Sequence, residues 1–228
     1  MVTTGLTLAL DAAASFGTIA VLAEGAVIAE RTVPMKSAGA ELFFPQLLDV
    51  LREAGTAPRD LARVVCGAGP GSFTALRVVG AIAKGLCEGT GCPLYGVPSL
   101  ALIVAAHDGT RGGGRWLATL DAMRDDRYLA LVTVAVGGEV TAVESLGLSP
   151  AAALAERATR LGATLIGPDE VCSATPHARG VVRCMGLVES TGAADLASWE
   201  PVYGRLAEAQ VKWEATHGRP LAADRLAT

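Results

Sequence analysis

The first third of the chain alternates short apolar runs with turn-forming residues. The runs span residues 6–10, 16–22 and 27–33, and the stretches 11–15 and 24–25 separate them with Asp, Ser and Gly. Runs of this length and spacing predict a three-strand meander. Residues 41–54 then place leucine and phenylalanine at helical spacing, so they predict a helix that ends at Gly55, with Pro45 in its first turn or at a kink.

The following residues predict alternating strands and helices. We expect a strand at 63–67, a helix at 73–89, a short strand at 94–97 and a helix at 99–107. The glycine-rich stretch 108–114 is the natural linker to a second half. These elements complete a first α/β domain over residues 1–107.

The second half repeats the strand order of the first. Strands are expected at 116–120, 128–136 and 140–144, with Gly137 and Gly138 as a hairpin turn. Ser149 and Pro150 are expected to cap a helix at 151–161. Residues 193–201 read as irregular, and 203–217 predict a terminal helix that stays with the second domain, 108–228, or packs back on the first.

A glycine-rich segment joins the strand at 63–67 to the helix at 73–89. Gly67, Gly69 and Gly71 alternate with small residues, and Ser72 is placed to cap the helix. Two interpretations stay open: a close strand-to-helix turn, or an anion site at the helix N-terminus made by Gly71 and Ser72. The segment lacks the Gly-Lys-Ser/Thr ending of a phosphate loop, so it is not a Walker sequence.

Asp11 ends the first predicted strand and has two interpretations. A carboxylate at this place can hold metal-bound phosphate, which would make Asp11 part of a nucleotide site. The next residues are Ala12, Ala13 and Ala14, which offer methyl groups where a nucleotide site needs hydroxyl groups and glycine. The alternative is an Asp that closes a turn by accepting from backbone amides.

Composition narrows the class of protein. The 228 residues are 51% hydrophobic and 18% charged, so the chain can bury a large core. A net charge of −4 disfavours direct RNA binding by this chain alone. Five cysteines without a Cys-x-x-Cys pair, no basic leader and no long apolar run predict a cytoplasmic protein with reduced thiols and no membrane contact.

The chain offers no recognisable catalytic or metal-binding set. His107, His177 and His217 are isolated, without the spacing that places two imidazoles on one helical face. No Gly-x-Ser-x-Gly elbow is present. We therefore expect no catalytic residues and no intrinsic metal or cofactor.

Two predicted helices carry features of a contact surface. Ala81 and Gly85 form a small-residue pair that lets another helix approach closely. In the helix at 41–54, Phe43 and Val50 lie off the apolar stripe that we place on Phe44, Leu47, Leu48 and Leu51. Either one helix face meets a partner, or both faces are buried within the domain.

Several motifs together resemble one protein family. They are the start Leu8-Ala9-Leu10-Asp11, the pattern Glu41-Leu42-x-x-Pro45, the glycine-rich block from Gly67 through Arg77 to Leu100, and Pro201-Val202-Tyr203-Gly204-Arg205. This set is similar to the TsaB family, also called YeaZ, which is related to TsaD, Kae and glycoprotease-like proteins. The family supplies a subunit of the bacterial machinery that makes threonylcarbamoyladenosine in tRNA.

The resemblance implies an α/β, actin-like fold of two similar domains, each with a mixed sheet flanked by helices. It implies a non-catalytic subunit that binds and activates a TsaD-like transferase, with a TsaE-like ATPase joining the complex, and ATP and metal bound by those partner subunits. Contact with tRNA at position 37 would be indirect, and the chain alone would form a homodimer. Family members commonly carry a Thr-Ser-type pair where this chain has Ala12 and Ala13, and often a His-Ser/Thr pair where it has Gly39 and Ala40. The loss of these polar groups weakens a nucleotide role.

The resemblance places the contact on the two long helices. The expected interface or interface-supporting positions are Leu47, Leu51, Leu76, Val79, Ala83 and Leu86. A large charged residue at Ala83 is then expected to break association and leave the fold intact. The alternative function is a free-standing actin-fold ATPase or phosphotransferase that uses Asp11 and Ser72.

Overall fold

The first sheet has five strands and begins with the expected meander. A computed structural model describes residues 5–35, 39–204 and 216. The strands are β1 (Leu6–Asp11), β2 (Phe16–Ala23), β3 (Ala26–Pro34), β4 (Leu61–Gly67) and β5 (Leu94–Val97). They lie in the order β3-β2-β1-β4-β5; the meander is antiparallel, and β4 and β5 run parallel to β1.

The second sheet repeats this arrangement. Its strands are β6 (Gly114–Asp121), β7 (Asp126–Val134), β8 (Val140–Pro150), β9 (Thr164–Gly167) and β10 (Cys172–Ser173). Their order is β10-β9-β6-β7-β8, so in both sheets an antiparallel meander is extended by two parallel strands on the side of its first strand. The predicted fold class, two similar mixed sheets flanked by helices, is confirmed.

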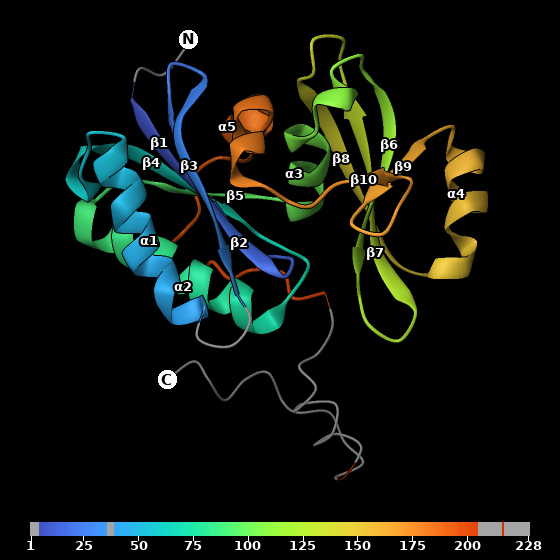
Figure 1. Ribbon diagram of the computed structural model, residues 1–228, viewed down its shortest axis with the longest axis horizontal. Coiled ribbons are helices and arrows are strands. Elements are labelled where there is room, and N and C mark those ends of the chain that lie inside the picture. The colour runs from blue at the N-terminus through green and yellow to red at the C-terminus, as the bar shows by residue number, and fades with distance from the viewer. Residues whose placement is uncertain (1–4, 36–38, 205–215, 217–228) are drawn as a thin grey trace.

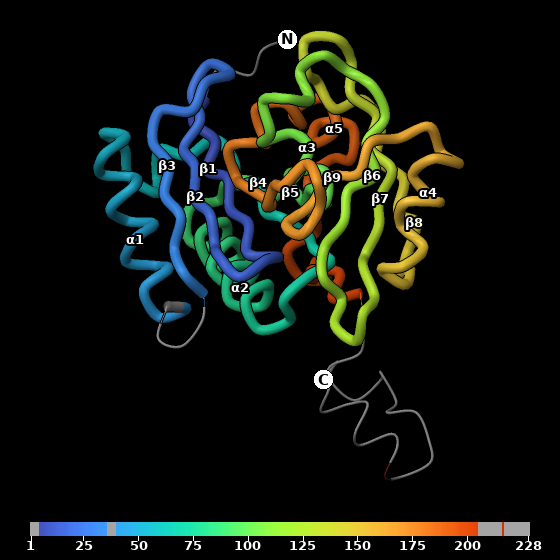
Figure 2. The backbone as a smooth tube through the Cα atoms, turned by 45° about the vertical axis from the view of Figure 1, so that its right-hand side comes forward, coloured from blue at the N-terminus to red at the C-terminus, as the bar shows by residue number. Residues whose placement is uncertain are grey.

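Helices form three layers around the two sheets (Figure 1). The long helices α1 (Gly39–Glu53) and α2 (Phe73–Thr90) cover the outer side of the first sheet, and α4 (Leu154–Leu161) covers the outer side of the second. Between the sheets lie α3 (Ser99–Ala106), the 3-10 helix η4 (Ala178–Cys184) and α5 (Met185–Thr191), and Figure 2 shows the same central layer from another side. Shorter 3-10 turns are η1 (Pro58–Asp60), η2 (Asp108–Thr110) and η3 (Ala151–Ala153).

One hydrophobic core joins the two sheets. The first seven residues of α3 are all buried, as expected of a helix that is apolar all round. Its side chains share a core with Ala9 and Val65 of the first sheet and with Ala118 and Val132 of the second. The predicted boundary between residues 107 and 108 falls where the chain passes from α3 toward β6.

The phase of helix α1 differs from the sequence-based expectation. Phe43 and Val50, expected off the core stripe, are fully buried, and Phe44, expected within it, is 43% exposed. The helix therefore turns Phe43, Leu47, Val50 and Leu51 toward the sheet. Leucine and phenylalanine occupy both faces of this helix, so the apolar pattern alone does not fix which face is buried.

The second half also differs in detail. Strand β8 continues to Pro150, so Ser149 pairs with Arg127 in the sheet and does not cap a helix. Leu154 begins α4, after the 3-10 turn. The predicted terminal helix lies almost entirely outside the described residues, and Tyr203 and Gly204 are not helical. Among the described helices, none has the length and apolarity to cross a membrane.

Candidate functional site

The glycine-rich turn between β4 and α2 packs tightly against the end of β1. A Cβ atom at Gly67 would lie 1.9 Å from Oδ2 of Asp11, and one at Gly71 would lie 2.2 Å from the carbonyl oxygen of Ala13. Gly69 has a φ of +83° and precedes a cis peptide bond to Pro70. Only glycine fits these positions, because any side chain would overlap neighbouring atoms.

Three amides of this turn are used by the chain itself. Ala68 N donates to Val97 O at 2.7 Å, Gly69 N to Ser99 Oγ at 3.0 Å, and Ser72 N to Ala13 O at 2.9 Å. Ser72 occupies the N-cap position of α2, but its side chain makes no capping hydrogen bond. The expectation that its hydroxyl caps the helix is therefore wrong. The bond that Ser72 does make is from its backbone amide to the β1–β2 turn.

Asp11 is sealed beneath the turn. It is 1% exposed, its Oδ1 accepts from Ala13 N at 3.0 Å, and its Oδ2 accepts from the hydroxyl of Ser99. Burial raises the pKa of the carboxyl to about 6, against the opposing effect of these two hydrogen bonds. The bond to Ala13 is the one expected of a turn-closing Asp, and a group so enclosed has no open position toward a ligand.

The segment 193–204 returns to the first domain and lies against α2 and the glycine-rich turn; we call it the strap. Ala194 N donates to Leu94 O at 2.7 Å, and Val202 N donates to Ala68 O at 2.7 Å. The ring of Tyr203 packs against that of Phe73 with centroids 4.6 Å apart and the ring planes tilted by 51°. The strap thus holds both the edge of the first sheet and the turn before α2.

Small residues of the first domain make room for the strap. A Cβ at Gly96 would lie 3.1 Å from Nε1 of Trp199, and one at Gly80 would lie 3.1 Å from the ring of Pro201. Nζ of Lys84 donates to Trp199 O at 3.1 Å. Part of the small-residue pattern of α2 is therefore explained by contacts within the chain.

The predicted partner-binding residues lie in the core. Leu47, Leu51, Leu76, Val79, Ala83 and Leu86 are all between 0% and 9% exposed. They pack beneath the helices and cannot themselves form an outer surface, although they support it from behind. At Ala83, with 0% exposure, a large charged residue would disrupt the core, so the expectation that it leaves the fold intact is wrong.

Other side chains of the same helices face outward. Leu42 and Phe44 of α1 are 55% and 43% exposed, and Ala81 of α2 is exposed. A Cβ at Gly85 would meet no atom within 4 Å. The small-residue pair of α2 therefore does lie on an open surface, as one of the two interpretations of the sequence required.

The described histidines cap 3-10 turns, and the cysteines are free thiols. Nδ1 of His107 accepts from Gly109 N at 3.1 Å, and Nδ1 of His177 accepts from Arg179 N at 3.2 Å, so each begins a 3-10 turn. His217 lies outside the described residues. Within residues 5–35, 39–204 and 216, no three His, Cys, Asp or Glu residues are grouped to hold a metal ion. The five cysteines are free thiols, and burial raises the pKa of Cys184 to about 12.

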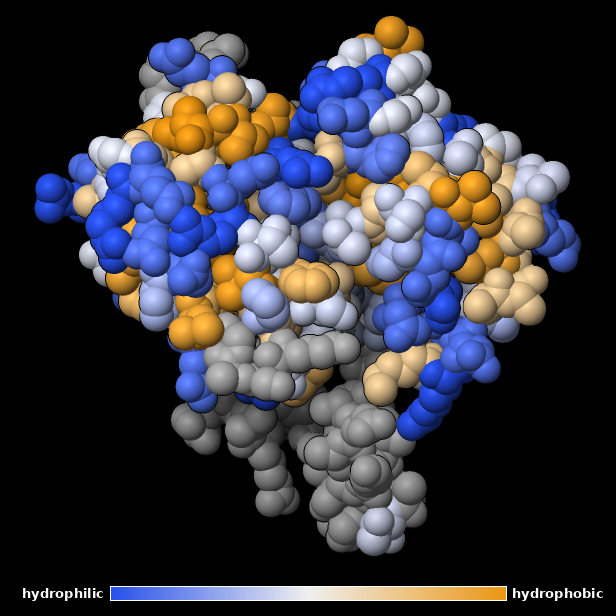
Figure 3. Space-filling model, viewed as in Figure 1, coloured by the Kyte–Doolittle hydropathy of each residue, from blue (hydrophilic) through white to orange (hydrophobic). Residues whose placement is uncertain are grey.

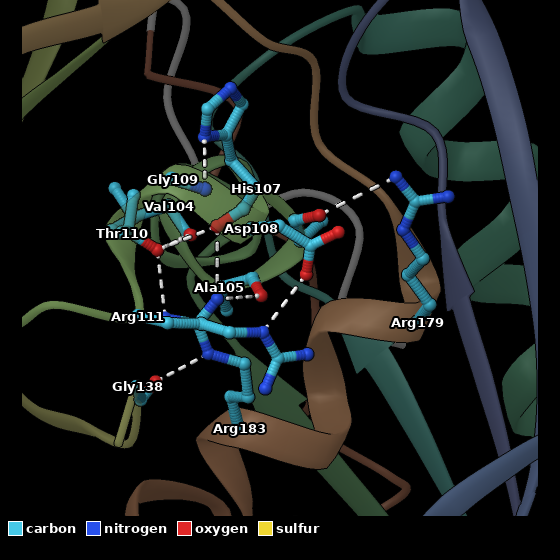
Figure 4. Close-up of polar contacts among 11 residues, drawn as sticks. Val104, Ala105, His107, Asp108, Gly109, Thr110, Arg111, Gly138, Arg179 and Arg183 are labelled. Carbon is cyan, nitrogen blue, oxygen red and sulfur yellow. Dashed lines mark hydrogen bonds and ion pairs between the residues drawn. The ribbon is translucent and has the colours of Figure 1, made fainter. Parts of the chain in front are cut away.

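Arg183 is a structural residue that sequence reasoning missed. Its guanidinium lies between the end of α3 and the β7–β8 turn (Figure 4). It donates to Ala105 O at 2.9 Å, to His107 O at 3.0 Å, to Gly138 O and to the hydroxyl of Thr110 at 2.7 Å. Carbonyls at a helix C-terminus attract a cation, so Arg183 joins the central layer to the second sheet. Nothing in its local sequence indicates these partners, which come from distant segments.

Comparison with known proteins gives the family. A family model described as "TsaD: tRNA N6-adenosine threonylcarbamoyltransferase" matches residues 34–159. The "tRNA threonylcarbamoyladenosine biosynthesis protein TsaB" of Escherichia coli is 32% identical over 123 residues, which cover 54% of this chain and 53% of that protein. The chain thus spans about half the length of this relative.

A second relative matches over more of its length. The protein of the same description from Bacillus subtilis is 27% identical over 213 residues, which cover 86% of this chain and 92% of that protein. An uncharacterised protein of Mycobacterium tuberculosis is 36% identical over 132 residues, which cover 57% of this chain and 60% of that protein.

Solved structures agree on the fold. A Pseudomonas aeruginosa protein described as similar to the peptidase YeaZ superposes with a TM-score of 0.74 at 24% identity, covering 89% of this chain and all of that one. A structure described as YeaZ from the same organism gives a TM-score of 0.68 at 22% identity, covering 88% of this chain and 100% of that one. The matched family model, which covers more than half of the chain, and the relatives named TsaB together show that this chain belongs to the TsaD family, within its TsaB/YeaZ group.

Proposed function

We propose that this chain is a non-catalytic subunit that binds a TsaD-like transferase and supports the formation of threonylcarbamoyladenosine at position 37 of tRNA. Its relatives from Escherichia coli and Bacillus subtilis are described as biosynthesis proteins for that modified nucleoside. The observation that carries the partner-binding part of the proposal is an apolar surface on α1 and α2.

This surface, the α1–α2 face, combines exposed apolar side chains with small ones. Its members on α1 are Phe44, Pro45 and Leu48, and its members on α2 are Ala81, Ile82 and Gly85. The two helices lie side by side on the outer side of the first sheet (Figure 1). In Figure 3, orange hydrophobic side chains interrupt the polar surface of the lobe that carries α1.

The geometry of the face suits a partner helix. Small residues at Ala81 and Gly85, four positions apart, let a second helix approach closely. The large apolar side chain of Phe44 would become buried on association, and such side chains supply most of the energy of an interface. The buried residues beneath the face, among them Leu47 and Val79, then act as its support.

The hydrogen bonds around the glycine-rich turn favour a non-catalytic role for it. Its amides at Ala68, Gly69 and Ser72 are bonded to Val97, Ser99 and Ala13, and the Asp11 carboxyl is enclosed by hydrogen bonds. A phosphate would need free amides and a carboxylate open to its metal ion. We therefore propose that ATP and metal are bound by the partner subunits, including a TsaE-like ATPase.

The chain alone is proposed to form a homodimer through the α1–α2 face. The apolar face that would meet the transferase is available to a second copy, so the two assemblies would compete. Contact with tRNA is proposed to be indirect because the net charge is −4.

Light scattering after size exclusion, with the chain alone and with the TsaD homologue of the same genome, tests the proposal. We expect a stable heterodimer that replaces the homodimer. Ala81→Arg should weaken the heterodimer by about 100-fold or more, because a bulky charge would keep the partner helix away. The matched control is Ala155→Arg on the exposed side of α4, which should bind as the original chain does.

Two results would overturn the proposal. One is the absence of a heterodimer at all tested salt and nucleotide concentrations. The other is equal binding by the Ala81 and Ala155 variants, which would move the contact to another surface.

The alternative, a free-standing ATPase or phosphotransferase that uses Asp11 and Ser72, makes a separate prediction. It requires magnesium-dependent nucleotide binding by the isolated chain, which calorimetry measures directly. Binding that Asp11→Asn abolishes would favour this alternative over the non-catalytic role.

A further inference from the structure

A cavity of about 350 Å³ lies between the two sheets, at the end of β1 remote from the glycine-rich turn. We call it the Thr7 cavity. Its lining comprises Gly5, Thr7, Leu22, Glu24, Gly25, Arg63, Glu139, Val182, Met185, Gly186 and Glu189. The surface is hollowed between the two lobes at the top of Figure 3, on the side where Figure 1 shows α5.

Three neighbouring strands build the floor of the cavity. Thr7 of β1 pairs with Leu22 of β2 on one side and with Arg63 of β4 on the other. Residues paired in this way point to the same face of a sheet. A hydroxyl, an apolar side chain and a guanidinium therefore lie in one row across the sheet.

The polar groups of the floor have unused hydrogen-bonding capacity. Thr7 is 5% exposed, and its hydroxyl makes no hydrogen bond to any described residue. Arg63 is 6% exposed and donates one bond, from Nη1 to Glu189 at 3.2 Å, while its guanidinium carries five N–H donors. The guanidinium also lies over the ring of Tyr95, 5.9 Å from its centroid. Its remaining N–H donors and the Thr7 hydroxyl line the cavity, so this floor offers donors to a ligand with a strong acceptor such as a carboxylate.

The rim carries the opposite charge. Oε1 of Glu139 lies at the first turn of α5, where a Cβ at Gly186 would approach it to 2.8 Å. Glu24 stands at the β2–β3 turn, and neither glutamate forms an ion pair within the described part of the chain. Because Glu189 already faces Arg63, the carboxylates of Glu24 and Glu139 leave the mouth of the cavity negative and suited to an ammonium group.

Apolar side chains complete the lining. Val182 and Met185 of the central layer face the cavity together with Leu22 of the floor. We propose that the Thr7 cavity binds a small zwitterion of the α-amino acid class, with its carboxylate at Thr7 and Arg63 and its ammonium group toward Glu139 and Glu24. The ligand would contact both halves of the chain, since the floor belongs to the first sheet and Glu139 to the β7–β8 turn.

The test uses the full chain and each common α-amino acid in turn as the probe. Saturation-transfer NMR should detect at least one of them at millimolar concentration. Thr7→Val keeps the shape of the side chain and removes the hydroxyl, so it should weaken binding by about tenfold. The control Thr164→Val, at an exposed position of β9, should leave binding unchanged. Glu139→Gln should also weaken binding, because it removes the negative partner of the ammonium group.

Derivatives of the best ligand separate the two ends of the site. The methyl ester lacks the carboxylate, and the N-acetyl derivative lacks the ammonium group, so both should bind more weakly than the parent amino acid. The proposal is overturned if no amino acid binds at tens of millimolar, or if binding is unaffected by Thr7→Val and Glu139→Gln. It is equally overturned if the methyl ester binds as well as the parent.

Discussion

Replacing Asp11 by Asn should stabilise the protein at neutral pH and remove part of its pH dependence. Asp11 is 1% exposed, and burial raises the pKa of its carboxyl from 3.8 to about 6. Between these pH values the native protein keeps a proton that the unfolded chain has released. The free energy of unfolding therefore falls as the pH rises through this window.

The size of the effect follows from the two pKa values. A difference between 3.8 and about 6, at about 1.4 kcal/mol per pKa unit, makes the ionised carboxyl cost about 3 kcal/mol at pH 7. Asn is neutral throughout and its Oδ1 can still accept from Ala13 N, the bond that Asp11 makes at 3.0 Å. The difference in stability between Asp11→Asn and the original chain should thus grow by about 2.4 kcal/mol from pH 4 to pH 7.

Urea unfolding of both proteins at a series of pH values, followed by tryptophan fluorescence, measures this difference. Carboxyls whose pKa is lowered by hydrogen bonds, such as those of Asp108 and Asp195, titrate in both proteins and cancel in the subtraction. A difference that stays constant with pH would refute the assignment of a buried, proton-binding carboxyl. A difference that shrinks as the pH rises would show that the charged form is the stabilised one.

Further predictions concern backbone packing, a buried cation and a histidine cap. Gly71→Ala should lower the free energy of unfolding by about 3 kcal/mol or more, since a Cβ would lie 2.2 Å from Ala13 O. In the control Gly89→Ala, the new Cβ meets nothing within 4 Å, so the free energy of unfolding should rise by up to about 1 kcal/mol. Similar urea midpoints for the two variants would contradict the close contact of Gly71 with Ala13. Arg183→Met should cost about 3–5 kcal/mol in thermal unfolding, because several buried carbonyls lose their donor, and a loss below about 1 kcal/mol would disprove that role. Burial lowers the pKa of His177 from 6.5, so the free energy of unfolding should fall as the pH drops below 6.5 through the pKa of the folded protein. His177→Asn keeps an acceptor for Arg179 N and should lessen that fall. Urea unfolding of both proteins at pH 5 and pH 7 measures the difference.

The sequence predicted well those elements that are marked by a local pattern of apolar residues bounded by turn-forming residues. Three apolar runs broken by Asp, Gly and Ser gave the meander of the first sheet, and α2 begins and ends within one residue of its predicted range. The short elements β9, β10, η4 and α5 carry no comparable periodicity. They are stabilised by tertiary contacts, such as those between η4 and α3, that local propensity does not encode.

The candidate sites likewise depend on contacts between distant segments that the sequence does not indicate. The glycine-rich turn was evident from its composition, but the partners that consume its amides, Ala13 and Ser99, lie far away in the chain. Likewise, Thr7 and Arg63 become neighbours through strand register, which the sequence alone does not specify. The buried stripe of α1 was predicted out of phase because Phe43 and Phe44 are equally apolar and only packing distinguishes them.

The strap has a consequence for the order in which the protein matures on the ribosome. Helix α2 is complete at Thr90, yet the residue that binds the turn before it, Val202, is made roughly 110 residues later. At synthesis rates of about 5–20 residues per second, this delay lasts about 6–22 seconds. During that interval the first sheet lacks the strap along β5. The first domain therefore finishes folding only when synthesis has passed through the second, so a truncated chain would present an incomplete α2 surface to any partner.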